Sequence, residues 1–152
     1  MTKMLVFDMD GTIANLYAVP NWLTDLESEK TRPYDEAKPL YPMEILTAIL
    51  CKLQKQGWKI AITTWLAMNG TKEYNTAVTK AKKNWLARYN FPYDEIHCVK
   101  YGTTKANCTR YKADFQILVD DNEKIRKGWT LGNTIDATKN ILPILEKLID
   151  TI

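Results

Sequence analysis

Histidine is nearly absent from this sequence, and its few cysteines have no spacing that would bind a metal. The single histidine is His97, and the three cysteines, Cys51, Cys98 and Cys108, form no C-x-x-C pair. No Cys/His spacing fits a zinc site, and a catalytic Ser-His-Asp or Cys-His set would depend on His97 alone. Because His97 falls in a predicted strand, we interpret it as a structural residue. An odd number of cysteines without a disulfide framework favours a reducing compartment.

Long apolar runs are missing as well. No stretch reaches the roughly 18 apolar residues that a membrane-spanning helix needs. The first residues carry one lysine and a few apolar side chains and then two aspartates, which is not the pattern of a signal peptide. We therefore expect a cytoplasmic protein that makes no contact with a membrane.

Neither sign of charge is in large excess. Lysine and arginine outnumber aspartate and glutamate by 21 to 18, which gives a formal net charge of +3. This mild charge suits an anionic substrate but does not by itself indicate binding of long nucleic acid. The 45% hydrophobic content is enough for a core in a chain of this size. We expect a single domain over residues 1–152.

Strand and helix patterns alternate along the chain. The predicted strands span residues 3–7, 58–63, 95–99, 115–119 and 133–136. The predicted helices span residues 15–29, 43–56, 71–89, 123–127 and 139–149, with the proline-rich connector 31–42 between the first two. This alternation predicts an α/β fold, a Rossmann-like three-layer sandwich with a central parallel sheet and helices on both faces. Residues 14 to about 40 stand outside it and are predicted to form a very small cap insertion.

The most informative segment is Asp8-Met9-Asp10-Gly11-Thr12, directly after the first predicted strand. Two carboxylates two positions apart project to the same side of an extended backbone. Such a pair can hold a divalent cation through oxygen ligands. One of the two can also attack phosphorus, while the other moves a proton. Gly11 lets the chain turn sharply after the site.

Polar residues follow the other predicted strands in the same way. They are Thr63 and Thr64 after the second strand, Lys100 and Lys105 after the third, and Asp120 and Asp121 after the fourth. Ligands of open parallel sheets bind outside the carboxyl ends of the strands. Mg²⁺ between the acidic residues would screen the repulsion between carboxylate and phosphate, and the lysine and threonine side chains would bind phosphate oxygens.

The order of these motifs resembles the haloacid dehalogenase-like (HAD) phosphohydrolase superfamily over most of the chain. Its four motifs are matched by Asp8-Met9-Asp10-Gly11-Thr12, by Ile60-Ala61-Ile62-Thr63, by Lys105 or, as the alternative, Lys100, and by Ile117-Leu118-Val119-Asp120-Asp121. The resemblance implies a fold, a phosphoryl-transfer chemistry and a role for each matched residue.

For the first motif, the resemblance implies one role for each aspartate. Asp8 would form a phospho-aspartyl intermediate, and Asp10 would protonate the leaving alcohol and later activate water. Thr63, Thr64 and Lys105 would bind the phosphoryl group. Mg²⁺ would be held by Asp8, the carbonyl of Asp10, and Asp120 and/or Asp121. An acid at position 10 favours a phosphatase or phosphomutase over a dehalogenase or transport ATPase, and the small cap favours the phosphatase.

The size and arrangement resemble the 5′(3′)-deoxyribonucleotidases and related short bacterial or phage phosphatases. The supporting segments are Leu40-Tyr41-Pro42-Met43, Thr63-Thr64-Trp65 and the strand ending in Asp120-Asp121, although the segment between the first two motifs is shorter here. We therefore expect a small phosphorylated substrate, a nucleotide. Four aromatic residues either stack on its base or pack the insertion onto the core: Tyr17, Trp22, Tyr34 and Trp65.

Two other functions stay open. A polynucleotide 3′-phosphatase has a similar layout, and the helix predicted at 71–89 carries a basic run of Lys72, Lys80, Lys82, Lys83 and Arg88. Such a run is more typical of a solvated helix face, so nucleic acid is the less favoured partner. The other alternative is a non-catalytic binding or regulatory protein that kept the fold.

Overall fold

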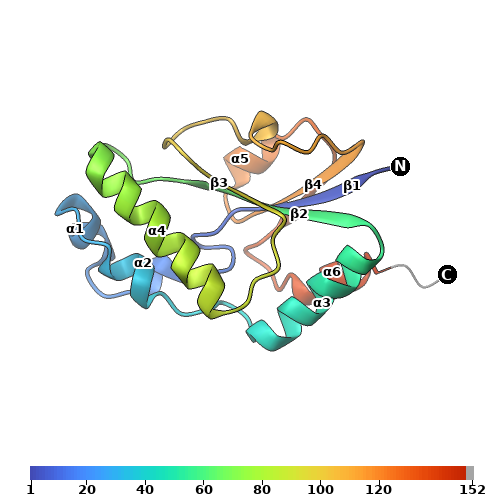
Figure 1. The fold of residues 1–152 in the computed structure, drawn as a ribbon, viewed down its shortest axis with the longest axis horizontal. Coiled ribbons are helices and arrows are strands. Elements are labelled where there is room, and N and C mark those ends of the chain that lie inside the picture. The colour runs from blue at the N-terminus through green and yellow to red at the C-terminus, as the bar shows by residue number, and fades with distance from the viewer. Residues whose placement is uncertain (150–152) are drawn as a thin grey trace.

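Five strands form one sheet at the centre of the protein. The computed structural model describes residues 1–149, and Figure 1 shows how they are arranged. The strands are β1 (Lys3–Phe7), β2 (Trp58–Trp65), β3 (Glu95–Val99), β4 (Phe115–Asp120) and β5 (Thr134–Asp136). They lie in the order β3-β2-β1-β4-β5, and every neighbouring pair is parallel. The predicted α/β fold with a central parallel sheet is confirmed, and all carboxyl ends of the strands lie at one edge.

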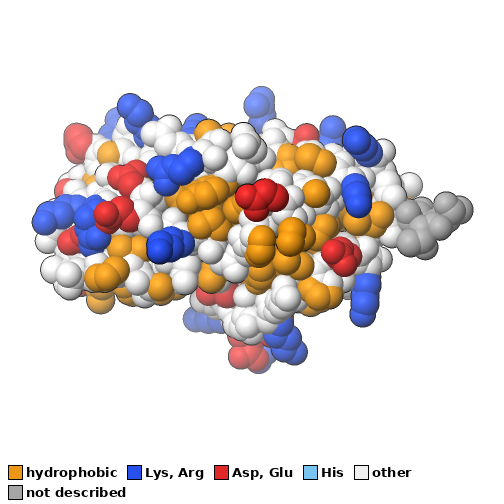
Figure 2. Space-filling model, turned by 90° about the horizontal axis from the view of Figure 1, so that it is seen from below, with side chains coloured by type: hydrophobic (Ala, Val, Ile, Leu, Met, Phe, Trp, Pro, Cys, Tyr) orange, Lys and Arg blue, Asp and Glu red, His pale blue; other side chains and the backbone are white. Residues whose placement is uncertain are grey.

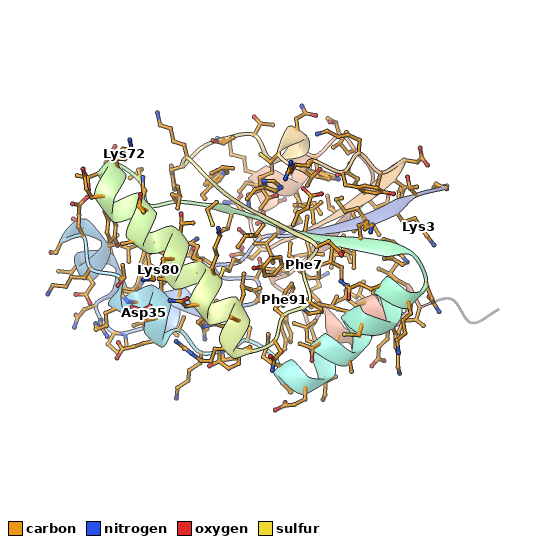
Figure 3. All side chains as sticks on the ribbon, in the orientation of Figure 1. Lys3, Phe7, Asp35, Lys72, Lys80 and Phe91 are labelled. Carbon is orange, nitrogen blue, oxygen red and sulfur yellow. The ribbon has the colours of Figure 1, made fainter. Side chains whose placement is uncertain are left out.

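Helices cover one face of the sheet. They are α3 (Met43–Lys55), α4 (Lys72–Arg88) and the short α6 (Leu142–Glu146), which contacts α3. Leu5 and Phe7 of β1 belong to this layer, where Phe7 meets Phe91 edge to face with 5.6 Å between the ring centroids (Figure 3). Alternate residues of a strand project to opposite faces, so Met4 and Val6 belong to a separate cluster on the other side.

The opposite face of the sheet has a thinner cover. It consists of the crossover between β3 and β4 and the short helix α5 (Glu123–Lys127). Ala106 of the crossover and Trp129, just after α5, pack there against Met4 and Val6. The three predicted layers are therefore present, although the crossover contributes only the 3-10 turn η2 (Lys105–Asn107) to its layer.

The segment before α3 differs from the prediction. The single helix expected at 15–29 is divided into the 3-10 turn η1 (Leu16–Ala18) and helix α1 (Trp22–Glu27). Pro20 cannot donate a backbone hydrogen bond, and Asn21 has a left-handed φ of 62°. These two residues explain why one helix cannot run through the segment.

The connector expected at 31–42 contains a further helix, α2 (Arg32–Glu36), which the prediction missed. Pro33 lies in its first turn, where proline is compatible with a helix. The insertion contacts α4 along most of that helix: the hydroxyl of Tyr74 donates to the carbonyl of Lys30 at 2.7 Å, and the indole of Trp85 to that of Ala37 at 2.7 Å. The division into one domain with a small insertion stays a prediction.

The ends of other strands and helices differ from the predicted ends by a few residues. Strand β2 continues to Trp65, two residues beyond its predicted end. Helix α6 is shorter than the predicted helix 139–149 and has Pro143 in its first turn. His97 of β3 pairs with Glu95 at 2.8 Å, and in the sheet register it lies beside Thr63 of β2. Within residues 1–149, no helix has the length and apolar character needed to cross a membrane.

Candidate active site

Strand register brings the first motif between two of the other motifs. Phe7, the last residue of β1, pairs with Ile62 of β2 on one side and with Val119 of β4 on the other. The next residue along each strand is therefore Asp8, Thr63 or Asp120, at the same level of the sheet. The backbone N–H of Asp8 continues the ladder by donating to the carbonyl of Val119 at 2.9 Å.

Three carboxylates gather at this level. Asp8, Asp120 and Asp121 each offer one oxygen, and these oxygens all lie within 4.8 Å of one another. The ammonium of Lys105, which is 4% exposed, lies 2.8 Å from Asp8 Oδ1 and 2.9 Å from Asp120 Oδ2. The hydroxyl of Thr12 lies 3.0 Å from Asp8 Oδ2 and 3.2 Å from Asp121 Oδ1. One lysine and one threonine thus hold the acidic cluster together.

The electrostatics of this cluster show an excess of negative charge. Burial and the charge of Asp8 raise the pKa of Asp121 to about 7, and the same two causes raise the pKa of Asp120. Burial lowers the pKa of Lys105, but the charges of Asp8 and Asp120 outweigh burial and the net direction is upward. The single ammonium does not balance three carboxylates. A divalent cation with a preference for oxygen ligands, such as Mg²⁺, fits this donor set.

Gly11 lets the first motif approach the fourth. Its φ of +82° lies in the left-handed region, which glycine adopts without strain. A Cβ at this position would lie 2.5 Å from Asp121 Oδ2 and 2.9 Å from Cε2 of Tyr17. Both the backbone conformation and the close contact therefore require glycine here.

The carboxylate of Asp10 is not part of the acidic cluster. Its Oδ2 accepts a hydrogen bond at 2.8 Å from the ammonium of Lys82 on α4. Burial raises the pKa of Asp10 in spite of this lysine. The metal contact expected of Asp10 involves its backbone carbonyl, and that contact stays a prediction.

Lys82 corrects the interpretation of the basic helix. This lysine was expected on a solvated face, but its side chain is completely buried, whereas Lys72, Lys80 and Lys83 of the same helix are exposed. The sequence contains one signal for the burial of Lys82. Lys82 lies four residues after the buried Val78, so helical spacing places it on the inward face.

The two threonines of β2 have different surroundings. The buried Oγ1 of Thr63 has no hydrogen-bond partner among residues 1–149, and Asp8 is its neighbour in register. Buried hydroxyls are rarely left unpaired, which suits a ligand oxygen at this place. The hydroxyl of Thr64 instead accepts from Lys82 at 2.7 Å. Of the two candidate lysines after β3, the structure brings Lys105 to the aspartates and leaves Lys100 exposed.

A cleft of about 840 Å³ opens over these groups. All four aromatic residues singled out from the sequence line it, together with Tyr101. Tyr17 and Trp22 of the insertion meet edge to face at 4.9 Å between ring centroids, and Trp65 and Tyr101 pack at 4.8 Å across the other wall. The acidic cluster thus lies at the bottom of a cleft with aromatic walls.

Comparison with known proteins gives a likeness of fold. No family model matches this chain, and no curated protein matches its sequence. The structure of D,D-heptose 1,7-bisphosphate phosphatase from Burkholderia thailandensis matches 95% of this chain and 99% of its own, with 15% identity and a TM-score of 0.53. The enzyme of that name from B. bronchiseptica, complexed with magnesium and phosphate, matches 84% of this chain and 74% of its own, with 16% identity and a TM-score of 0.49. The first likeness shows that this chain shares the fold of that phosphatase.

Proposed function

We propose that this protein is a Mg²⁺-dependent phosphatase of the HAD superfamily, which hydrolyses a phosphate monoester through a phospho-aspartate intermediate. The observation that carries this proposal is the cluster of Asp8, Asp120 and Asp121, with oxygens within 4.8 Å of one another and the buried Lys105 bonded to two of them. A protein with the same fold and 15% identity is itself a phosphatase.

The metal would be held by Asp8, Asp120 and Asp121, with the backbone carbonyl of Asp10 as a further ligand. Carboxylate and carbonyl oxygens are the ligands that Mg²⁺ prefers. When bound, the ion would neutralise the charge of the phosphoryl group beside these carboxylates.

The protein's own residues would carry out two displacement steps. In the first, an oxygen of Asp8 forms a bond to phosphorus, the bond from phosphorus to the leaving oxygen breaks, and Asp10 gives that oxygen its proton. In the second, a water attacks the phosphorus and Asp10 takes a proton from it. The bond from Asp8 to phosphorus breaks, and inorganic phosphate leaves. Lys105 and the unpaired hydroxyl of Thr63 would bind the phosphoryl oxygens in both steps.

The cleft favours a nucleoside monophosphate as the substrate. Aromatic rings on both walls offer a stacking surface for a base next to the acidic cluster. Among the described residues that line the cleft, Lys105 is the one lysine or arginine, while Glu27 and Glu29 add negative charge. A second phosphate on the substrate would find no second lysine or arginine among the described residues of this lining. Residues 14 to about 40 would act as the small cap that supplies Tyr17 and Trp22 to this cleft.

Turnover by purified protein tests the proposal. Wild-type protein with Mg²⁺ is expected to release phosphate from deoxynucleoside 5′-monophosphates faster than from a sugar bisphosphate. Asp8→Asn should lower kcat by about 10⁴-fold or more, because the nucleophile is removed. Glu44→Gln, which removes an exposed carboxylate from α3, is the matched control. Asp8→Asn with the wild-type Mg²⁺-dependent rate would contradict the assignment.

A second candidate is a polynucleotide 3′-phosphatase, which the exposed Lys72, Lys80 and Lys83 of α4 favour. Against it, Figure 2 shows Lys and Arg intermixed with Asp and Glu over the face seen from below, rather than gathered in one basic track. Comparing a 3′-phosphorylated oligonucleotide with a deoxynucleoside monophosphate decides between the two. Silence of the wild-type protein on all these phosphates would instead favour a non-catalytic binding protein.

We also propose a cytoplasmic location. Cys51, Cys98 and Cys108 are all free thiols in the structure, which suits a reducing compartment. Fractionation of cells that express the protein, followed by immunodetection, tests this.

A further inference from the structure

Lys82 is a buried cation that the proposed phosphoryl-binding groups do not explain. Among the lysines of residues 1–149, Lys82 and Lys105 are the two that are buried. Lys105 contacts the acidic cluster, whereas Lys82 contacts Asp10 on the other side of the first motif. Its role must therefore concern Asp10 or the end of β2.

All three protons of the Lys82 ammonium have an acceptor. Nζ lies 2.8 Å from Asp10 Oδ2, 2.7 Å from Thr64 Oγ1 and 2.9 Å from the carbonyl oxygen of Trp65. The ring of Tyr34 lies below the same ammonium, with its centroid 5.1 Å away. An ammonium with three acceptors has one orientation that satisfies them all. Asp10 is therefore tied to β2 as well as to α4.

The opposite side of the Asp10 carboxylate is left open. No residue that the structure describes donates a hydrogen bond to Oδ1, and Asp10 lines the cleft. One oxygen of this carboxylate is thus fixed in the protein interior, and the other is available to a group in the cleft. This is the arrangement that proton transfer to a bound ligand requires.

Stability alone is a weak reason for this lysine. Taking a charge out of water costs several kcal/mol, and a well-packed apolar side chain of similar volume often stabilises a protein as much as a buried ion pair does. Helix α4, which carries Lys82, is also held in place independently by the hydrogen bonds from Tyr74 and Trp85 to the insertion. The ammonium therefore sits on a fixed support and is not needed to attach it.

We propose that Lys82 is a positioning residue, which holds Asp10 through Oδ2 so that Oδ1 faces the leaving oxygen of the substrate. This inference rests on the proposed phosphatase function. In the step that it serves, the proton of Asp10 moves to the leaving oxygen as the bond between that oxygen and phosphorus breaks. A substrate whose leaving group departs without a proton gains little from this positioning in the first step.

The dependence of rate on the leaving group tests the proposal. Lys82→Met should lower kcat on an alkyl phosphate by about 100-fold, with KM changed by less than about threefold, because general acid catalysis is lost. In the same variant, a single turnover of p-nitrophenyl phosphate should release nitrophenolate at within about threefold of the wild-type rate, because this anion leaves without taking up a proton. Lys83→Met, an equal change at an exposed position of α4, is the control and should match wild type in both assays. Equal loss with both substrates would overturn the proposal.

A double variant covers the case in which Lys82→Met folds poorly. Removing both partners of a buried pair leaves no unpaired charge, so Asp10→Asn combined with Lys82→Met should fold better than Lys82→Met alone. If Lys82 acts through Asp10, the double variant and Asp10→Asn have the same kcat. A further loss in the double variant would mean that Lys82 acts elsewhere.

Crystal structures of wild type and Lys82→Met give a readout that does not need turnover. The Asp10 side chain should leave its wild-type position in the variant, and an unchanged Asp10 would overturn the inference. A wild-type protein that hydrolyses none of the phosphates would reject the proposed function, while this comparison would still decide whether Lys82 positions Asp10.

Discussion

Lys105 and Lys82 each bind one aspartate of the first motif, but different parts of the fold support them. Lys105 lies in a 3-10 turn of the β3–β4 crossover, which the indole of Trp65 holds by donating to the carbonyl of Thr103 at 2.8 Å. Lys82 projects from the middle of α4, the longest helix among residues 1–149. The proposed phosphoryl-binding side of the cleft is therefore built from a loop, and the proposed proton-transfer side from a helix.

Removing the lysine of the loop side should have the largest effect. Lys105→Met is expected to lower kcat/KM by about 10³-fold on alkyl and aryl phosphates alike, because charge on the phosphoryl group loses a fixed partner. The equal loss on both substrates would contrast with the selective loss expected of Lys82→Met. Steady-state rates on the two substrates check this, with exposed Lys100→Met as control. A loss confined to alkyl phosphates would show that the two lysines share one role.

The next largest effect is on the affinity for Mg²⁺ at the acidic cluster, on the Lys105 side of the cleft. Gly11→Ala would place a Cβ 2.5 Å from Asp121 Oδ2 in a backbone with φ +82°, so we expect about 2 kcal/mol of destabilisation and weaker Mg²⁺ binding. Gly57→Ala is a matched control, because Gly57 has φ +93° and no atom within 4 Å of a new Cβ. Calorimetric titration with Mg²⁺ measures the difference. Equal Mg²⁺ affinity in the two variants would mean that the contact with Asp121 is not needed.

The smallest effect is a pH dependence of the folding stability, which arises from Asp121 in the acidic cluster beside Lys105. In the metal-free fold the pKa of Asp121 is raised from 3.8 to about 7. Between about pH 4 and pH 7 the folded state therefore binds more protons than the unfolded state, and stability should fall as pH rises through this window. Asp121→Asn should remove part of that fall, so that Tm decreases by about 3 °C less in the variant than in wild type over this window.

Thermal unfolding in EDTA between pH 4.5 and pH 7.5 measures whether Tm falls as pH rises over the range in which Asp121 titrates. Adding Mg²⁺ should reverse the trend for the wild type, since the ion binds the deprotonated carboxylate. Wild type and Asp121→Asn with parallel curves in EDTA would contradict the prediction.

Much of the fold could be predicted from the sequence, because local patterns determine it. The strands at 3–7 and 95–99 have their predicted bounds, since the first is an apolar run that ends at Asp8 and the second follows the helix end at Asn90-Phe91-Pro92. The division of the helix expected at 15–29 depends on the left-handed backbone of Asn21, which the apolar spacing does not report. Helix α2 was missed because prolines within a short segment look the same in a connector and in a first helical turn.

The site was predictable where residues follow strands and not where they come from a helix. Asp8, Thr63 and Asp120 share one level because parallel register aligns the ends of adjacent strands. Lys82 was missed because a lysine in a basic helix is solvated in most proteins. Its burial depends on acceptors from distant parts of the chain, Asp10 and the end of β2, and only the folded structure brings these together.

Three of the hydrogen bonds that tie the insertion to α4 end on backbone atoms of the insertion. Tyr74, Trp85 and Arg88 of α4 donate to the carbonyl oxygens of Lys30, Ala37 and Asp35. Every residue type has such a carbonyl, so exposed side chains of the insertion can be exchanged without loss of these three bonds. Substrate preference could therefore be redesigned, or diverge in evolution, at Tyr17 and Leu23 while the attachment of the insertion is preserved.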